Sequence, residues 1–168
     1  LSKTLTYKNK TVQTPLGQKK VSLIQNSLVL CSVLRAGLPL HQGLLNYFDY
    51  ADNAFISAYR YHRDNRDAFE VIVKYFAAPS LDGKTLILMD PMLATGNSSV
   101  AAIDLIKEQG ATNIRFLCLL AAPEGVARMQ EAHPDVPIVT AAVDERLNEK
   151  GYIVPGLGDA GDRMFGTK

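Results

Sequence analysis

A strand pattern runs directly into a helix start at Leu86-Ile87-Leu88-Met89-Asp90-Pro91-Met92-Leu93-Ala94-Thr95-Gly96-Asn97-Ser98-Ser99. The apolar run at 85–89 is typical of a strand buried on both faces, as in a parallel sheet. Asp90 follows this run, and small and hydroxyl residues then open a helical pattern. Because the N–H groups of a helix start are unpaired, they attract anions. The segment therefore predicts an α/β fold with a phosphate site at the end of a strand. An ordinary helix capped by Ser98 is an equally good interpretation.

The rest of the chain repeats this alternation of strands and helices. Apolar, β-branched runs predict strands at Ser27–Val33, Ala54–Tyr59, Thr85–Met89, Ile114–Leu120 and Ile138–Ala142. Helical patterns lie between them, at Leu40–Phe48, Ser98–Gln109 and Glu124–Ala132. Gly110 is placed to end the second helix in a left-handed conformation. The alternation predicts a mainly parallel sheet flanked by helices.

Three segments stand apart from this pattern. Residues 1–20 are polar and rich in turn residues, and we interpret them as an N-terminal arm or a truncated edge before a domain over 21–168. A charged run at 60–67 precedes alternating apolar residues, which favours a protruding hairpin over 60–80, with a short surface helix as the alternative. The glycine-rich tail from Gly151 cannot form core, so its backbone is expected to be shaped for some purpose.

Composition excludes several classes of protein. With 47% hydrophobic and 21% charged residues, the chain is neither disordered nor fibrous, and no apolar run approaches the length of a membrane span. The net charge of +1 argues against a protein that grips nucleic acid. Cys31 and Cys118 lie in apolar runs and are expected to be buried free thiols. No secretory signal pattern opens the chain, which predicts a cytoplasmic location.

Two other kinds of chemistry are not supported. Gly83-Lys84-Thr85 resembles the end of a phosphate-binding P-loop, but Ala78 stands where the first glycine is required, and the segment precedes a strand. A kinase of that class is therefore excluded. Structural or surface roles are expected for the histidines, since none has a partner at metal-ligand or triad spacing: His41, His62 and His133.

Three motifs together resemble one enzyme family. Asp90-Pro91-Met92-Leu93-Ala94-Thr95-Gly96 resembles the phosphoribosyl diphosphate (PRPP) signature of uracil phosphoribosyltransferases. Val33-Leu34-Arg35-Ala36-Gly37 is similar to their pyrophosphate loop, and the segment 151–162 is similar to their uracil-binding segment. The resemblance implies a type I phosphoribosyltransferase fold with a C-terminal hood over residues 144–168. It also implies transfer of the phosphoribosyl group of PRPP to uracil, giving UMP and pyrophosphate in pyrimidine salvage.

The resemblance assigns roles to individual residues. Catalytic roles fall to Asp90, Arg35 and Asp159, with Asp90 contacting the ribose hydroxyls alone because Pro91 cannot. The implied PRPP-binding residues are Arg35, Arg60, Asp90, Pro91, Met92, Leu93, Ala94, Thr95, Gly96, Asn97, Ser98 and Asp159. The implied uracil-binding residues, acting mainly through main-chain groups, are Ile153, Gly158, Asp159 and Ala160. Asn97 departs from the family pattern, which has a second glycine there.

The resemblance also implies cofactors and partners. Mg²⁺ is expected through pyrophosphate, with Asp159 as a candidate ligand and no dedicated metal cluster in the sequence. GTP is a candidate effector. A homodimer or larger homo-oligomer is expected, and the simplest role for the aromatic residues of the hairpin is a subunit contact. Two alternatives stay open: a relative acting on another nucleobase, and an RNA-binding regulator of the same fold that senses UMP.

Overall fold

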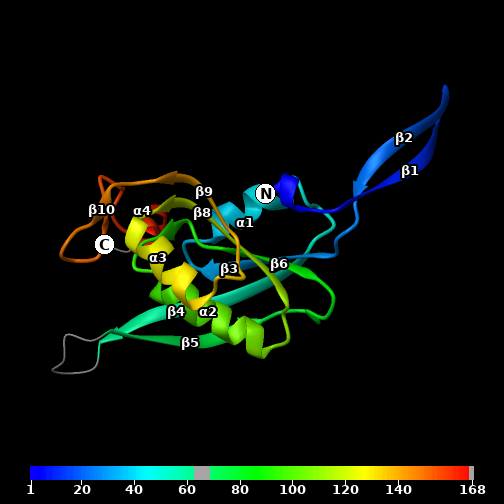
Figure 1. Ribbon diagram of the computed structural model, residues 1–168. Helices are drawn as coiled ribbons and strands as arrows, with labels where there is room; N and C mark the ends of the chain where they lie inside the picture. The colour runs from blue at the N-terminus through cyan, green and yellow to red at the C-terminus, as the bar shows by residue number, and fades with distance from the viewer. Residues whose placement is uncertain (63–68, 167–168) are drawn as a thin grey trace.

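The computed structural model describes residues 1–62 and 69–166, with the side chains of all these except 58–62 and 69–74 (Figure 1). Within them, a seven-stranded sheet has the order β5-β4-β3-β6-β8, with β7 and β9 also paired to β8. Its strands are β3 (Leu28–Leu34), β4 (Asp52–His62), β5 (Phe69–Ala77), β6 (Thr85–Met89), β7 (Met92–Leu93), β8 (Asn113–Ala121) and β9 (Ile138–Val143). All pairs are parallel except β4–β5. The predicted mainly parallel α/β fold is confirmed.

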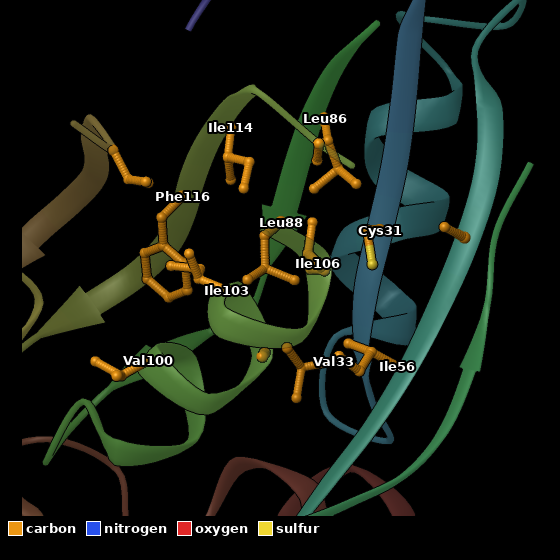
Figure 2. Packing of buried hydrophobic residues seen from close by; sticks show 14 of the residues in the cluster. Cys31, Val33, Ile56, Leu86, Leu88, Val100, Ile103, Ile106, Ile114 and Phe116 are labelled. Atoms are coloured by element: carbon orange, nitrogen blue, oxygen red, sulfur yellow. The ribbon is translucent and has the colours of Figure 1, made fainter. Parts of the chain in front are cut away.

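Helices cover both faces of this sheet. Helix α2 (Asn97–Glu108) and helix α3 (Pro123–Ala132) pack on one face, and α1 (Leu38–Leu45) packs on the other with Leu5. Figure 2 shows Ile103 and Ile106 of α2 against Leu88 of β6. Both isoleucines are fully buried, and each such side chain stabilises the fold by roughly 1.5–3 kcal/mol. The hydrophobic cores on the two faces of the sheet hold the carboxyl ends of β3 and β6 side by side.

Every helix and strand predicted between residues 27 and 142 is present, with shifts of up to three residues at its ends. The largest concern β4, which runs over Asp52–His62 rather than 54–59, and α1, which begins at Leu38 rather than Leu40 and ends at Leu45 rather than Phe48. Pro39 lies in the first turn of this helix, where proline is favoured because its missing N–H would have no partner. Gly110 follows α2 with a φ of 92°, the left-handed conformation expected for it.

Two hairpins extend from the body of the protein (Figure 1). Strands β1 (Tyr7–Thr14) and β2 (Gly17–Ile24) form an antiparallel hairpin that projects away from the central sheet. The hairpin runs past residue 20, where the N-terminal arm is predicted to end. The boundaries of the arm (1–20) and the domain (21–168) stay a prediction. Strands β4 and β5 form the second hairpin, so the alternative of a helix is wrong for the part at 69–77. The turn of this hairpin, at 63–68, lies outside the described residues.

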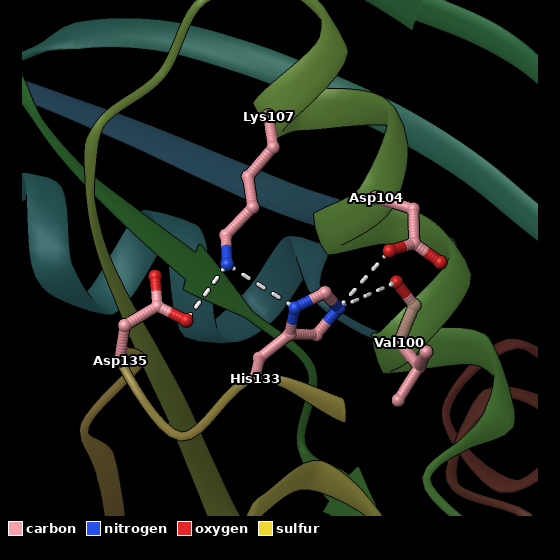
Figure 3. Close-up of polar contacts among 5 residues, drawn as sticks. All are labelled: Val100, Asp104, Lys107, His133 and Asp135. Atoms are coloured by element: carbon pink, nitrogen blue, oxygen red, sulfur yellow. Dashed lines mark hydrogen bonds and ion pairs between the residues drawn. The ribbon is translucent and has the colours of Figure 1, made fainter. Parts of the chain in front are cut away.

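A polar cluster joins α2 to the segment after α3 (Figure 3). Lys107 Nζ donates to Asp135 Oδ1 at 2.8 Å and lies 3.2 Å from His133 Nδ1. Because an ammonium group only donates, Nδ1 must accept, and Nε2 carries the proton toward the Val100 carbonyl oxygen and Asp104. Buried His133 therefore has the structural role predicted for it.

The remaining sequence predictions for His41 and the cysteines also agree with the structure. His41 is buried between Ser32 Oγ, 2.7 Å from Nδ1, and Asn53 Oδ1, 2.6 Å from Nε2. Cys31 and Cys118 are buried free thiols, and burial raises the pKa of Cys31 to about 12. The side chain of His62 lies outside the described residues.

Candidate active site

A cavity of about 640 Å³ opens at the carboxyl ends of the parallel strands. Its lining comes from the loop after β3 (33–36), from the loop and helix start at 90–99, from Ser57 of β4 and from the hood (151–162). These segments are far apart in the sequence. The fold therefore brings the predicted phosphate loop and the glycine-rich hood to a single cleft, in the crevice where open α/β sheets bind ligands.

The phosphate loop begins where β6 ends and finishes in the first turn of α2. Gly96 is the N-cap of α2, with a φ of 79° and no side-chain hydrogen bond to the helix start. The alternative of Ser98 as an ordinary N-cap is therefore wrong. Thr95, Ser98 and Ser99, which all carry hydroxyl groups, line the cavity. The helix start thus offers N–H and O–H donors to an anion.

Helix α3 supports this loop from behind. Gly125, near its start, packs against the carbonyl oxygens of Leu93 and Ala94, so closely that a Cβ at Gly125 would overlap Ala94 O. The N–H of Ala122 donates to Leu93 O at 2.9 Å. The backbone of the loop is thereby fixed against α3, with no room for a side chain between them.

The strand β8 holds the loop from the side. The Pro91 carbonyl oxygen accepts from the N–H groups of Leu119 at 3.0 Å and Leu120 at 3.1 Å, between the pairings of β6 and β7 with β8. Asp90 lines the cavity, and one of its carboxylate oxygens accepts from the N–H of Met92 at 3.3 Å. The loop therefore presents the Asp90 carboxylate from a backbone anchored in the sheet.

Not every residue that the resemblance assigned to PRPP lines the cavity. Three residues of the phosphate loop are not part of its lining: Pro91, Leu93 and Asn97. The residues of this loop that do line the cavity are Asp90, Met92, Ala94, Thr95, Gly96 and Ser98. Leu93 is fully buried in the core. Asn97 opens α2 in a helical conformation, which does not require glycine, so its departure from the family pattern fits the backbone. The side chain of Arg60 lies outside the described residues.

The hood is ordered by its own hydrogen bonds. Strands β10 (Arg146–Leu147) and β11 (Ile153–Val154) pair, and Leu147 N–H donates to Glu124 of α3, which lowers the pKa of that carboxyl. Asp159 is the N-cap of a short helix, α4 (Ala160–Phe165), and accepts from Asp162 N–H at 2.9 Å. The residues assigned to uracil all line the cavity: Ile153, Gly158, Asp159 and Ala160.

Arg35 faces the hood from the loop after β3. Its guanidinium lies 4.0 Å from Asp162 Oδ1 and 5.7 Å from the centre of the Phe165 ring. The Arg35 side chain is 54% exposed, and Arg35 and Asp162 both line the cavity. Arg35 therefore places a cation at the cavity, beside the hood.

Comparison with known proteins identifies the family. A sequence model of uracil phosphoribosyltransferase matches residues 1–167. The chain belongs to the uracil phosphoribosyltransferase family. It is 57% identical to uracil phosphoribosyltransferases from Agrobacterium fabrum and Paracoccus denitrificans, over 94% of this chain and 75% and 74% of those proteins. As an enzyme of this family it is a transferase, and these relatives do not favour the RNA-binding alternative.

Solved structures confirm the phosphoribosyltransferase fold. The structure of the AQ2163 protein from Aquifex aeolicus has a TM-score of 0.88 and 36% identity, covering 99% of this chain and 78% of that one. A hypoxanthine phosphoribosyltransferase from Staphylococcus aureus has a TM-score of 0.59 and 16% identity, covering 84% of this chain and 79% of that one. The second likeness shows the fold alone.

The cavity of this uracil phosphoribosyltransferase also includes residues to which the sequence analysis gave no role. Ser57, Tyr152 and Asp162 line it without having been assigned a role. Ser57 pairs with Leu34 in the parallel β3–β4 ladder, which brings it beside the Arg35 loop. Finding Ser57 from the sequence would have required knowing the order of the strands in the sheet. Tyr152 and Asp162 lie inside the hood motif, next to residues that the resemblance did assign.

The donor set of the cavity suits a magnesium ion bound together with a diphosphate. Among the described residues, no group of three or more histidine, cysteine or acidic side chains could hold a metal. Asp90 and Asp159 nevertheless place carboxylate oxygens at the same cavity. Mg²⁺ is commonly held by one or two carboxylates plus substrate phosphates, so these residues fit the ion.

Within the described part of the chain, no helix has the length and apolar character needed to cross a membrane.

Proposed function

We propose that this chain transfers the phosphoribosyl group of PRPP to uracil, forming UMP and pyrophosphate. The observation that carries the proposal is the single cavity shared by the phosphate loop and the hood. The family name of its relatives supports the same substrates. In the reaction, the bond from the anomeric carbon to pyrophosphate breaks, the bond to N1 of uracil forms, and the N1 proton is released.

The phosphate loop would bind the ribose 5-phosphate of PRPP. The first-turn N–H groups of α2 and the hydroxyls of Thr95 and Ser98 provide the donors. Asp90 would accept from the ribose hydroxyls, which fixes the anomeric carbon relative to the hood. A carboxylate next to the sugar also stabilises the positive charge that develops in an oxocarbenium-like transition state.

Arg35 and the hood would bind the two groups that exchange at the anomeric carbon. A guanidinium pairs bidentately with phosphate oxygens, so Arg35 suits the pyrophosphate. Uracil has an edge of carbonyl, N–H and carbonyl groups, which the backbone of Ile153, Gly158 and Ala160 can read. Mg²⁺, held by pyrophosphate with Asp159 or Asp90, would neutralise negative charge on the leaving group. These residue roles are proposals that rest on both the family resemblance and the lining of the cavity.

A panel of nucleobases tests this function. PRPP-dependent turnover is measured with uracil, cytosine, adenine and hypoxanthine, in the presence of Mg²⁺ and after chelation. We expect turnover with uracil alone and its loss on chelation. Turnover with another base and none with uracil would show that the hood serves a different substrate. A cytoplasmic location, a homo-oligomeric state and regulation by GTP stay predictions.

Replacing Asp159 tests the proposed role of the hood in catalysis. Asp159→Asn is expected to lower kcat about 10²-fold or more, because it removes the charge that faces PRPP and its metal. Asparagine also caps helices well, so α4 and the unfolding midpoint should be preserved. Glu145→Gln, which removes an exposed hood carboxylate outside the cavity, is the control and should leave kcat unchanged. Normal turnover by Asp159→Asn would contradict the role.

A further inference from the structure

The loop after β3 and the hood touch each other across one end of the cavity. Arg35 reaches from the loop to two residues of α4: its guanidinium lies 4.0 Å from Asp162 Oδ1 and 5.7 Å from the Phe165 ring centre. Beside this contact, a Cβ placed on Gly161 would be 3.8 Å from Ala36 Cβ, so α4 begins against the same loop. The half of the cavity assigned to pyrophosphate is thus in direct contact with the half assigned to uracil.

The chemistry of this contact leaves Arg35 able to bind a ligand as well. A guanidinium has five N–H donors in a planar fork and can stack one face on an aromatic ring while its edge binds an anion. The guanidinium carbon lies over the Phe165 ring, and Nη2 forms a long ion pair with Asp162 Oδ1, so these two contacts use only part of the guanidinium. A diphosphate in the cavity can therefore bind Arg35 without displacing the hood from it.

We infer that Asp162 and Phe165 are positioning residues that couple the two half-sites, so that diphosphate and uracil strengthen each other's binding. This inference rests on the proposed function. A diphosphate that fixes the Arg35 side chain also fixes the ring and the carboxylate that contact it, and with them α4 and the main chain at 158–160. Uracil then binds to a hood whose ordering entropy has already been lost, and linkage makes the effect reciprocal.

The test measures uracil binding by equilibrium dialysis, with and without saturating inorganic pyrophosphate. For the unsubstituted protein, we expect pyrophosphate to tighten uracil binding about three- to fivefold, the scale of one exposed ion pair or cation–π contact. Phe165→Leu and Asp162→Asn should each bring this ratio to about one. The leucine variant changes no charge, so its effect cannot come from altered repulsion of the pyrophosphate.

Matched variants separate coupling from damage to the helix. Met164→Leu changes an exposed neighbour on α4 and should keep the full ratio, as should Phe165→Tyr, which retains the ring. In an Arg35→Gln background, Phe165→Leu should have no further effect on the ratio. Circular dichroism confirms that each variant is folded.

The outcomes distinguish this inference from the proposed function. If the unsubstituted protein binds uracil and pyrophosphate independently, the function stands and the coupling is wrong. The same conclusion follows if the ratio is unchanged in both Phe165→Leu and Asp162→Asn, or if pyrophosphate weakens uracil binding. If it binds neither ligand, the proposed function fails and the inference fails with it.

Discussion

Helix α2 meets different surroundings at its two ends. At the first turn, Gly96 provides no side-chain cap, and the hydroxyls of Thr95 and Ser98 face a cavity. At the last turn, Lys107 is paired with Asp135 and hydrogen-bonded to His133, whose other nitrogen faces Val100 and Asp104. Polar groups at the second end satisfy one another, whereas those at the first are directed into the cavity.

This difference separates binding from stability within one helix. A polar group that its neighbours satisfy contributes to folding, and its loss is felt as lost stability. A polar group that faces a cavity contributes to ligand binding instead. Substitutions at the start of α2 should therefore change kinetics more than stability, and substitutions at its end should do the opposite.

Among substitutions near the two ends of α2, the largest effect is expected from Asp90→Asn, at the start of the phosphate loop. Hydrogen bonds to a charged group are worth about 1.5–3 kcal/mol, so kcat/KM for PRPP should fall roughly 10- to 100-fold. Steady-state kinetics at saturating uracil measure this. Asp104→Asn, at an exposed position in the second half of α2, is the control and should keep kcat/KM. An unchanged kcat/KM in Asp90→Asn would contradict the role of Asp90 in binding PRPP.

Gly125→Ala tests whether the loop depends on its support from α3. The added Cβ would overlap the Ala94 carbonyl oxygen, so the loop must shift. We expect an approximately tenfold higher KM for PRPP and a loss of about 1–3 kcal/mol in unfolding free energy. Gly43→Ala on α1 is the matched control, because a Cβ there meets nothing within 4 Å. The control should gain about 0.5–1 kcal/mol in stability and keep its KM.

His133→Ala addresses the other end of α2. It leaves Lys107 and the buried space around the ring without their partner, and unfolding free energy should fall by about 1–3 kcal/mol. Urea unfolding measures this loss, while kcat/KM below the transition should not change. Lost activity at unchanged stability would contradict the division between the two ends of the helix.

The smallest effect is expected from pH acting on Asp135. The hydrogen bond from Lys107 lowers the pKa of the Asp135 carboxyl below its ordinary value of about 3.9. A lowered pKa in the folded state means that the pair contributes stability above pH 4 and loses it as the pH falls through the folded value. The stability difference between wild type and Asp135→Asn, under about 1 kcal/mol because the site is exposed, should vanish in acid. A difference that persists at pH 2.5 would contradict the pairing.

The centre of the fold could be predicted because burial and periodicity agree there. Strand β6 is apolar on both faces, and Val100, Ile103 and Ile106 repeat at helical spacing, so both elements were found. The phosphate loop followed from their junction. The predicted start of α1 is two residues late, because the helix already includes Pro39 in its first turn, where proline is well tolerated.

The rest depended on contacts that a linear pattern does not contain. Helix α4 is short and glycine-containing, and its one local signal was Asp159 placed to cap the N–H of Asp162. Ser57 enters the cavity only because β4 pairs with β3. The β1–β2 hairpin lies in a largely polar segment, where Pro15 and Gly17 at its turn are the clearest local signal.

The double acceptor at Pro91 ties the phosphate loop to the sheet. Two amides of β8, those of Leu119 and Leu120, are bonded to this one carbonyl oxygen. Because both amides are hydrogen-bonded, deuterium should enter them only when β8 separates from the loop. The groups proposed to receive the sugar phosphate therefore follow a segment of backbone that is fixed to the sheet.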